Sequence, residues 1–533
     1  MKQVLFGAML LMMGCAGQAD DITVRFNGST AEVSGMASLL SRDSVTVTVD
    51  GAKVNVESLY RGHRLTLRLT GESDDGQLVL NAAGKAKVTL DGLTLTSQEG
   101  APLWLKNKKK VEVTAAKGTE NTLTVTACAD TANHKAAVIW AKDKLLLSGK
   151  GTLNVVAIGD GCRGIKTKKD IIVEDVTLNV MTSGNNLGEK PFGFGGPPFG
   201  GEMPDFGEGF PNFGEGFPNF GEGFPDFGGG APPFGNDSLR PGGFPPFGGE
   251  MPDFGEDFPD FGGGFPPFGN DSTQFGGFPP FDGGMPDFGG GGFGGKRKYV
   301  ASAKGIASKG KITINSGCVT VRTSTAGAEG IEGKQGIVFN GGTVDVVTPD
   351  DAINANATIE FNGAHVTAWS MGNDAVDANP EGGFFPPFGG NGGTIEPAIV
   401  IRGGTVYAWS QVGPPEEGLD SDMAPLAIEG GTVFTVGGGM GEMPSVPTNE
   451  TARQPTVVLI GLSVEKDEPI TIYKSTGQRV NKSTGQQVTI PFSMRRSASV
   501  VSSPVFKLGG TYTVRTKDYE RTFTLDEPLT VVR

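Results

Sequence analysis

The chain has 533 residues, of which 86 are Gly, 35 Pro and 34 Phe, and its formal net charge is -14. This acidic balance argues against nucleic acid as a partner and favours cations and glycans. The length would suggest several compact domains, but a repeat protein grows by adding coils, so its repeats are the better guide to its organisation.

The N-terminus has the features of a signal peptide over residues 1–19. Lys2 supplies a positive charge, residues 4–13 form a short apolar run, and Gly17-Gln-Ala19 offers small residues for cleavage. The sequence around Cys15 also resembles a lipoprotein box, so simple secretion and lipid anchoring at Cys15 are both open. No later apolar run is long enough to span a bilayer. We therefore expect a bacterial protein that is secreted or attached to the outer cell surface, with a membrane contact only through such a lipid.

Three cysteines, Cys128, Cys162 and Cys318, remain once Cys15 is removed or acylated. An odd number in an exported protein means at least one free thiol or an intermolecular bond. Cys128 and Cys162 do not align in the repeat described below, so we expect no obligatory disulfide. No CxxC motif or neighbouring His indicates a metal or nucleophile role for these thiols.

Residues 20–75 alternate apolar and polar side chains, as in Val45-Thr-Val-Thr-Val49 and Leu65-Thr-Leu-Arg-Leu69. We expect these strands to form an N-terminal cap, because an open solenoid end exposes unpaired strand edges. The first coils then occupy residues 76–187.

Residues 297–444 continue the coils with a repeat of about 22 to 27 residues. Successive copies open on an aliphatic residue, Ile306, Ile331, Ile353, Val376 and Leu419, and Ile165 opens an earlier copy. A short strand, a glycine turn and a second strand follow, as in Ile337-Val-Phe339, Gly341-Gly342 and Val344-Asp-Val346. A fixed period with strands, glycine turns and no helical periodicity predicts an all-β solenoid. Three short strands per coil favour a right-handed parallel β-helix.

A low-complexity insert interrupts the repeat at residues 188–296, where sequences such as Phe-Pro-Pro-Phe-Gly recur. Proline and glycine at this density oppose helix and sheet, so we expect a long disordered segment. It is either a tolerated loop that leaves one coil corner, or a cohesive segment that makes matrix or self-contacts. A shorter insert occurs at residues 380–393. After Pro444 the glycine turns fade, and residues 445–533 are predicted to form a small C-terminal β module or cap.

Several stretches are similar to a family of secreted bacterial proteins. They are Gly-Lys-Ala-Lys-Val-Thr-Leu-Asp-Gly-Leu-Thr-Leu-Thr-Ser (84–97), Lys-Gly-Thr-Glu-Asn-Thr-Leu-Thr (117–124), Leu-Ser-Gly-Lys-Gly-Thr-Leu-Asn-Val (147–155) and Ser-Pro-Val-Phe-Lys-Leu-Gly-Gly-Thr-Tyr-Thr-Val (503–514). The family is described as carbohydrate-binding, with a domain of unknown function and a pectate-lyase-like β-helix. The resemblance covers most of the chain outside the insert and rests on the order of the strand–turn patterns. It implies calcium binding and affinity for cellulose or acidic plant polysaccharide, without an established lyase activity.

Stacked coils bring equivalent residues about 4.8 Å apart, so these residues form columns. Two residues before the opening aliphatic, the column contains Ala101, Ala137, Arg163, Lys304, Glu329, Asp351, Asp374 and Glu417. One residue after it, the column contains Trp104, Trp140, Lys166, Ala307, Glu332, Asn354, Asp377 and Asp420. One edge of the solenoid is therefore predicted to change from aromatic through basic to acidic.

The acidic half of these columns is the candidate metal site. Two carboxylates about 4.8 Å apart repel by roughly 0.9 kcal/mol even at the dielectric constant of water. Either some carboxyl groups hold protons or a cation lies between the coils. Calcium suits such a site, because it takes six to eight hard oxygen ligands with flexible geometry. The candidate ligands are Glu329, Glu332, Asp350, Asp351, Asn354, Asp374, Asp377, Glu417 and Asp420. The alternative is a solvated acidic edge that resists aggregation.

Aromatic and basic residues form the candidate glycan site, which contains Trp369, Tyr407, Trp409, Trp104, Trp140, Arg163 and Lys166. Trp369 and Trp409 occupy the same register in consecutive coils, and an outward strip of such rings could stack on sugars. The alternative for Trp369 and Trp409 is packing beneath the shorter insert or the C-terminal module.

These patterns together favour an exported, monomeric, calcium-dependent polysaccharide-binding protein for cellulose or acidic glycans. A catalytic role is not specified, because the basic column members lie coils away from the acidic cluster. Stacked acids also offer the carboxyl separations of a glycosidase trivially. Two other classes stay open: a polysaccharide lyase acting on uronate polymers, and a structural or adhesive surface protein that uses the insert.

Overall fold

The computed structural model describes most of the chain beyond its N-terminus, apart from the long insert and several loops. The described residues are 22–35, 45–59, 61, 64–127, 136–189, 299–380, 396–422, 424–439, 443–475 and 486–533. They all belong to one compact unit. Every regular element in these ranges is a β-strand, so no described helix is long and apolar enough to cross a membrane. The predicted signal peptide, Cys15, residues 190–296 of the predicted insert and most of the shorter insert lie outside them.

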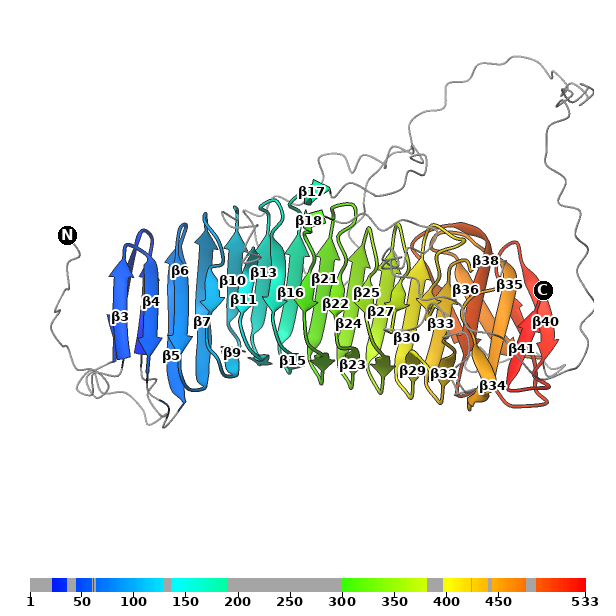
Figure 1. The fold of residues 1–533 in the computed structure, drawn as a ribbon. Helices are drawn as coiled ribbons and strands as arrows, with labels where there is room; N and C mark the ends of the chain where they lie inside the picture. The colour runs from blue at the N-terminus through cyan, green and yellow to red at the C-terminus, as the bar shows by residue number, and fades with distance from the viewer. Residues whose placement is uncertain are drawn as a thin grey trace, which may run out of the picture. The chain divides into compact units, whose positions relative to one another are not determined.

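One sheet of eleven strands forms one side of the stack (Figure 1). In spatial order its strands are β3 (Val45–Asp50), β4 (Lys53–Ser58), β6 (Gln77–Ala82), β8 (Leu103–Leu105), β11 (Ala137–Ala141), β14 (Arg163–Thr167), β19 (Ile306–Ser308), β22 (Ile331–Gly333), β25 (Ile353–Ala355), β28 (Val376–Ala378) and β31 (Leu419–Asp420). From β4 onward all neighbours are parallel.

A larger sheet of 24 strands forms two further rows of parallel strands. One row contains β9 (Val111–Ala115), β12 (Leu145–Gly149), β15 (Ile171–Glu174), β20 (Ile312–Ile314), β23 (Ile337–Phe339), β26 (Ile359–Phe361), β29 (Ile399–Ile401), β32 (Leu426–Ile428) and β34 (Pro447–Ala452). The other contains β10 (Glu120–Val125), β13 (Thr152–Ala157), β16 (Thr177–Thr182), β21 (Cys318–Thr323), β24 (Thr343–Thr348), β27 (His365–Ser370), β30 (Thr405–Ser410) and β33 (Thr432–Val436). The long strand β7 (Ala86–Ser97) pairs with both β9 and β10, so it joins the two rows. The stacked rows make an all-β solenoid.

The first strands of the chain close the N-terminal end of this stack. Strand β1 (Ile22–Asn27) pairs antiparallel with β2 (Thr30–Ser34) and parallel with β5 (Leu65–Ser73), which continues to β7. Strand β3 pairs antiparallel with β4. Because β4 and β5 already pair in parallel with later strands, parallel stacking begins inside the range predicted as a cap.

The last strands form the C-terminal module. Strands β35 (Thr456–Val464), β38 (Met494–Ser502) and β41 (Leu529–Val532) extend the large sheet, and β38 pairs antiparallel with the last coil strand, β33. Strands β36 (Pro469–Lys474), β37 (Gln486–Thr489), β39 (Thr511–Arg515) and β40 (Glu520–Thr524) form a separate four-stranded antiparallel sheet. These strands cover the end of the stack that the coils leave open.

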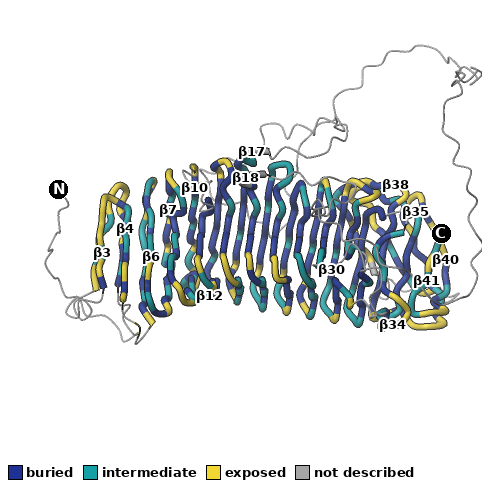
Figure 2. Tube along the Cα trace, in the orientation of Figure 1, coloured by how far each residue is buried: buried dark blue, intermediate teal, exposed yellow. Residues whose placement is uncertain are grey.

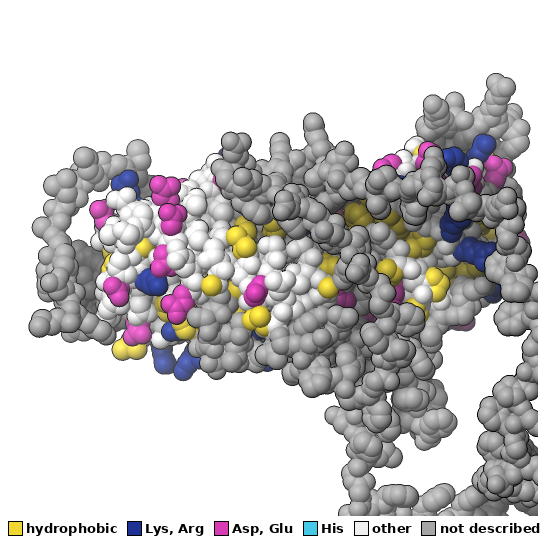
Figure 3. Space-filling model, turned by 90° about the horizontal axis from the view of Figure 1, so that it is seen from above, with side chains coloured by type: hydrophobic (Ala, Val, Ile, Leu, Met, Phe, Trp, Pro, Cys, Tyr) yellow, Lys and Arg dark blue, Asp and Glu magenta, His cyan; other side chains and the backbone are white. Residues whose placement is uncertain are grey.

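Every second side chain of the strands in all three rows points into the solenoid interior, and most of these side chains are aliphatic, with some aromatic ones. Exposed residues gather at the turns (Figure 2). The aliphatic residues that open the repeats pair with one another in register, and all are buried. Full burial of one such side chain is worth about 1.5–3 kcal/mol relative to exposure. On the face seen in Figure 3, single hydrophobic side chains are scattered among polar ones, and charged side chains gather toward the two ends.

Glycine in the turns allows the coils to approach one another closely. Gly404 has a φ of 82°, a conformation that favours glycine over other residues. A Cβ atom there would lie only 2.1 Å from the backbone oxygen of Ala364 in the preceding coil. The glycine turns of the repeat are therefore required by the stacking distance as well as by the turn itself.

A short antiparallel pair marks the point where the repeat is interrupted. Strands β17 (Leu187–Glu189) and β18 (Tyr299–Ala301) pair with each other, Leu187 opposite Ala301. Asn186 supports this point, because its Oδ1 accepts a hydrogen bond of 2.8 Å from Ala303 N. The chain thus leaves the stack and returns to it at one place.

The expectation of no obligatory disulfide is wrong for Cys162, which is disulfide-bonded. Its partner lies outside the described residues, while Cys318 is a free, exposed thiol. Alignment in the repeat was the wrong criterion. Cys162 lies in the turn before β14, and a disulfide requires only that two Cα atoms approach within about 7 Å.

The interior predicts how a core substitution acts. The rings of Phe339 and Phe361 stack in adjacent coils with centroids 5.0 Å apart, and both are fully buried. Phe361→Ala should lower the free energy of unfolding by about 3–5 kcal/mol because it opens a cavity. Val412→Ala, at a side chain that is 52% exposed, should change it by less than about 0.5 kcal/mol. Urea denaturation followed by tryptophan fluorescence measures both, and equal losses would contradict this assignment of the core.

Candidate metal and glycan site

The outer face of the eleven-stranded sheet carries one of the two predicted columns in unbroken register. Because side chains alternate across a strand, the residue after each buried opening aliphatic points away from the interior. From β8 to β31 the paired residues are Trp104, Trp140, Lys166, Ala307, Glu332, Asn354, Asp377 and Asp420. The column therefore changes from aromatic to basic to acidic across one sheet.

The second column lies where the chain enters the same strands, either in the preceding turn or, as for Ala137 and Arg163, at the first residue of the strand. Backbone hydrogen bonds align these turns: Gly164 N donates to Lys304 O at 3.1 Å, and Gly330 N donates to Asp351 O at 3.0 Å. The same ladder continues from Ala375 N to Glu417 O at 3.0 Å. The two columns thus run side by side along one edge of the sheet.

Two lysines neutralise the glutamates in the middle of the columns. Lys304 Nζ lies 2.9 Å from Glu329 Oε2 and 2.7 Å from Glu332 Oε1, and Lys334 Nζ lies 2.5 Å from the same Glu332 oxygen. Burial opposes the charge of Glu332, but the two lysines outweigh it and lower the pKa of Glu332 to about 2. Burial raises the pKa of Glu329 to about 7 despite the attraction of Lys304.

The structure therefore does not group Glu329 and Glu332 with the other candidate metal ligands. They belong to a salt-bridge network with Lys304 and Lys334. The sequence places Lys304 in the column beside Glu329, which is the signal for this pairing. A lysine side chain is long enough to span one coil spacing of about 4.8 Å, so it reaches both carboxylates.

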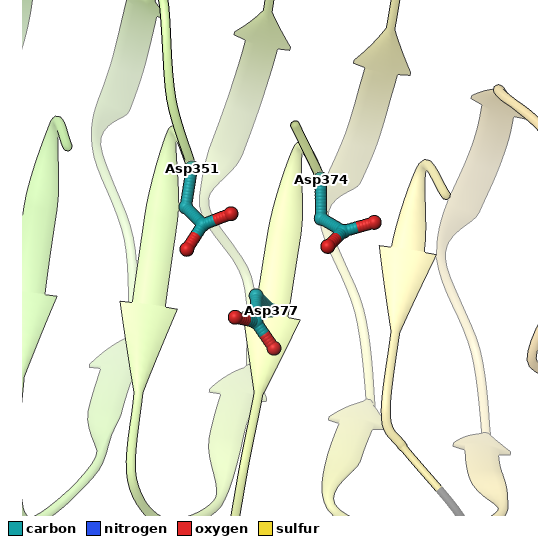
Figure 4. A group of neighbouring side chains, drawn as sticks. All are labelled: Asp351, Asp374 and Asp377. Atoms are coloured by element: carbon teal, nitrogen blue, oxygen red, sulfur yellow. The ribbon is translucent and has the colours of Figure 1, made fainter. Parts of the chain in front are cut away.

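Three aspartates meet in the acidic half of the columns. Asp351 precedes β25, Asp374 precedes β28, and Asp377 lies within β28, and all three side chains point toward one region (Figure 4). One carboxylate oxygen of each lies within 4.8 Å of the other two. The residues are 0%, 5% and 1% exposed. We call these three residues the aspartate cluster.

Asn354 links two members of the aspartate cluster. Its Nδ2 donates hydrogen bonds of 2.7 Å to Asp351 Oδ2 and 3.0 Å to Asp377 Oδ2. As oriented, the amide acts as a donor to the carboxylates, whereas a metal ligand would present its oxygen. Asp374 Oδ1 accepts a hydrogen bond of 2.6 Å from the backbone nitrogen of Glu417.

The electrostatics of this region favour bound protons when no cation is present. Burial raises the pKa of Asp374 well above its usual range, and the charges of Asp420, Asp351 and Asp377 raise it further. Burial, followed by the charge of Asp420, raises the pKa of Glu417 to about 8.

The remaining acidic candidates are bound to their own neighbours at the margin of the aspartate cluster. Asp350 Oδ1 accepts a hydrogen bond of 2.8 Å from Asn373 Nδ2. Asp420 Oδ1 accepts a hydrogen bond of 2.8 Å from the backbone nitrogen of Asp422. Glu417 Oε2 accepts a hydrogen bond of 2.5 Å from Ser445 N, in the segment that leads into β34.

Trp369 and Trp409 do not form an exposed strip. They are 8% and 4% exposed and share one hydrophobic cluster with residues of the C-terminal module. The ring of Trp369 stacks on Phe492 with centroids 5.8 Å apart, and its Nε1 donates to Gln411 Oε1 at 3.1 Å. Tyr407 is half-buried and stacks on Trp409 with centroids 6.2 Å apart. The alternative that these rings pack beneath the C-terminal module therefore holds for Trp369 and Trp409.

The tryptophans at the other end of the column have different surroundings. Trp104 and Trp140 meet edge to face with ring centroids 6.3 Å apart, in a small cluster separate from the solenoid interior. Trp104 is half-buried and Trp140 is buried. Lys106 Nζ lies 3.8 Å from the centroid of Trp104, a cation–π contact that the sequence columns did not include.

Comparison with known proteins finds similarity to one family of proteins. Residues 36–190 and 293–375 match the family model of carbohydrate-binding domain-containing proteins. The chain is also 26% identical over 191 residues to a carbohydrate-binding domain-containing protein of Acetivibrio thermocellus. That alignment covers 34% of this chain and 65% of the relative, so the chain spans less than two thirds of the relative's length. No solved structure matches this chain. Asp351 and Asp374 lie inside the matched range, and Asp377 lies just beyond it.

Trp369→Ala tests the structural role of this ring. The substitution removes a buried indole beneath the C-terminal module and should lower the free energy of unfolding by about 3–5 kcal/mol. Trp104→Ala should cost less, because that side chain is half-buried. Thermal unfolding and limited proteolysis of both variants measure the difference. A Trp369→Ala protein with unchanged stability would contradict the packing described here.

Glu417→Gln tests whether burial keeps the Glu417 carboxyl group protonated. Folding raises the pKa of Glu417 from 4.5 to about 8, so between these values the folded chain holds more protons than the unfolded chain. Its contribution to stability therefore falls as the pH rises through this window. The glutamine variant should be more stable than the parent at pH 8, by more than about 1 kcal/mol, and should show a flatter pH dependence. Urea denaturation of chelator-treated protein from pH 5 to pH 9 provides the comparison, and superimposable profiles would refute the prediction.

Proposed function

We propose that this chain is an exported polysaccharide-binding protein whose contact with glycan depends on calcium at the aspartate cluster. The observation that carries the proposal is the convergence of three buried carboxylates at one edge of a stacked sheet. Two of them belong to the range that resembles carbohydrate-binding proteins. Polysaccharide binding is the function which that similarity suggests.

The spacing of the carboxylates supports calcium. Calcium–oxygen distances are about 2.3–2.6 Å, so two oxygens on one ion lie up to about 5 Å apart. The 4.8 Å limit within the aspartate cluster agrees with this requirement. In the proposed site Asp351, Asp374 and Asp377 supply carboxylate oxygens. Asn354 adds its Oδ1 after its amide turns over, and the positive charge of the ion replaces the protons that burial favours on Asp374.

The proposal includes two further features. Its fold is a right-handed parallel β-helix, supported by three rows of parallel strands and glycine turns. Export rests on the N-terminal sequence alone, with Lys2, the apolar run and the small residues that follow. In this proposal a bound calcium ion attracts the carboxylates or hydroxyl groups of a glycan that lies along the outer face of the eleven-stranded sheet.

Calorimetric titration of metal-stripped protein tests the proposal, first with calcium and then with polygalacturonate and a neutral β-glucan. We expect calcium uptake by the parent protein and a loss of at least about 100-fold in calcium affinity for Asp351→Asn/Asp374→Asn, because two charged ligands are removed. The matched control is Asp74→Asn/Asp518→Asn, which removes two exposed carboxylates and should bind calcium normally.

Three outcomes would contradict different parts of the proposal. No calcium heat in the parent would remove the metal, and glycan binding without calcium would remove the dependence on it. Time-dependent release of unsaturated sugars from polygalacturonate would replace binding by lyase activity.

A further inference from the structure

The described strands at the N-terminal end of the solenoid cover its interior only in part. Of the described residues, Ala31, Val33, Val47 and Val446 pack against the main core but are only partly buried. The first three belong to strands β2 and β3, at the outer end of the stack, and Val446 precedes β34. The other end of the stack is covered by the C-terminal module. The apolar interior is therefore most open beside β2 and β3.

Strand β3 is the edge strand of the eleven-stranded sheet at this end (Figure 1). It pairs with β4 without a register shift, and among the described strands it has no other neighbour. Most of its residues are exposed, and Val49 is 43% exposed (Figure 2). Backbone N–H and C=O groups along the outer side of such a strand can pair with the strand of another molecule.

The two edge strands at this end differ in how they are protected. Proteins usually guard a sheet edge with charged residues, proline or a bulge. Strand β2 carries an exposed carboxylate at its centre, Glu32, which lies opposite Arg25 of β1. Strand β3 contains neither proline nor lysine, and Asp50 at its last position is its single charged residue. Strand β3 is therefore the edge that is left open to pairing.

The sequence of β3 is the same in both directions about Val47, because it reads Val45-Thr-Val-Thr-Val49. If two such strands pair antiparallel about a two-fold axis at Val47, each valine lies opposite a valine and Thr46 lies opposite Thr48 of the other copy. Pairs of β-branched side chains are favourable across neighbouring strands. The strand is thus complementary to a second copy of itself, which favours this chain over an unrelated partner.

We propose that two copies of this chain associate end to end through their β3 strands, which pair antiparallel about Val47. The two-fold axis is perpendicular to the sheet, so the inner face of one sheet continues as the inner face of the other. Val47 then packs against its own copy and covers the interior that is open in one molecule. The two Asp50 side chains lie about 20 Å apart at opposite ends of the paired strands, so no like charges oppose each other.

This dimer goes beyond the proposed function and does not depend on it. It differs from the monomer expected from the sequence. Because rotation about an axis perpendicular to the sheet keeps each face on its side, the outer columns of both copies face the same way. One surface can therefore contact the two aspartate clusters at once, and linked sites of this kind bind more tightly than either site alone.

A pair of charge variants tests the dimer by sedimentation velocity of the full chain, at concentrations up to about 100 µM so that a micromolar Kd is detected. Thr46→Lys/Thr48→Lys places lysines opposite each other twice and should raise the Kd of the dimer at least about tenfold. Thr46→Lys/Thr48→Glu is the matched control, because lysine of one copy then lies opposite glutamate of the other. This control should keep the dimer.

Both variants should fold, because Thr46 and Thr48 are exposed and lie opposite Glu57 and Asn55 within the chain. Thermal unfolding at low protein concentration checks this. A parent that stays monomeric, or equal Kd values for the two variants, would overturn the inference. So would a dimer that persists in Thr46→Lys/Thr48→Lys, because the contact would then involve another surface, such as the low-complexity insert.

Oxidative cross-linking tests the register in a Cys318→Ser background, which removes the free exposed thiol. Residues directly opposite each other in an antiparallel pair have Cα atoms about 4.5–5.5 Å apart, within the range of a disulfide. Val47→Cys should therefore give a covalent dimer. Thr48→Cys should not, because its own copy lies on the diagonal, at about 7–8 Å. Failure of Val47→Cys to cross-link, or equal cross-linking of both variants, would contradict pairing about Val47.

Discussion

Successive strands of the eleven-stranded sheet pair without a shift from Trp104 to Asp420, and every feature of the outer columns depends on that register. A one-residue slip would turn the charged column into the interior and the opening aliphatics out to solvent. The interior prevents such a slip, because each coil buries its aliphatic residues against those of the next coil. Packing energy inside the stack thus fixes the positions of charges outside it.

The same register creates the electrostatic problem that the outer face must resolve. Equivalent carboxylates repeat at the spacing of the strands, too close to be charged without compensation. The chain resolves this in different ways along one column. Lys304 and Lys334 neutralise the glutamates, Asn354 donates hydrogen bonds to two aspartates, and burial favours a proton on Glu417. Burial, followed by the positive charge of Arg163, lowers the pKa of Lys166 to about 7 in the basic part of the same column.

The features that were predicted correctly from the sequence are those that the repeat period determines. The opening aliphatics, the glycine turns and the order of residues in the columns all follow from one repeat, and strand pairing in the structure follows the same order. The period could not predict contacts between the stack and residues outside it. Trp369 and Trp409 are in register, but both are buried by the C-terminal module, where Phe492 stacks on Trp369. The repeat does not specify which face of the solenoid this module packs against. The disulfide at Cys162 belongs to a turn, where sequence alignment does not reveal spatial distance. The pairing of Lys304 with two glutamates depends on side-chain reach, which a column of residue types does not specify.

Strands β17 and β18 pair antiparallel where the repeat is interrupted, yet β14 and β19 on either side of the interruption pair as ordinary neighbours. The strand pairing on either side of the interruption therefore does not fix the number of residues between 189 and 299. The pairing of β14 with β19 is made by residues on either side of that stretch, so it does not depend on the number of residues between them. The solenoid can thus keep the register of its outer columns while the length of the intervening sequence changes.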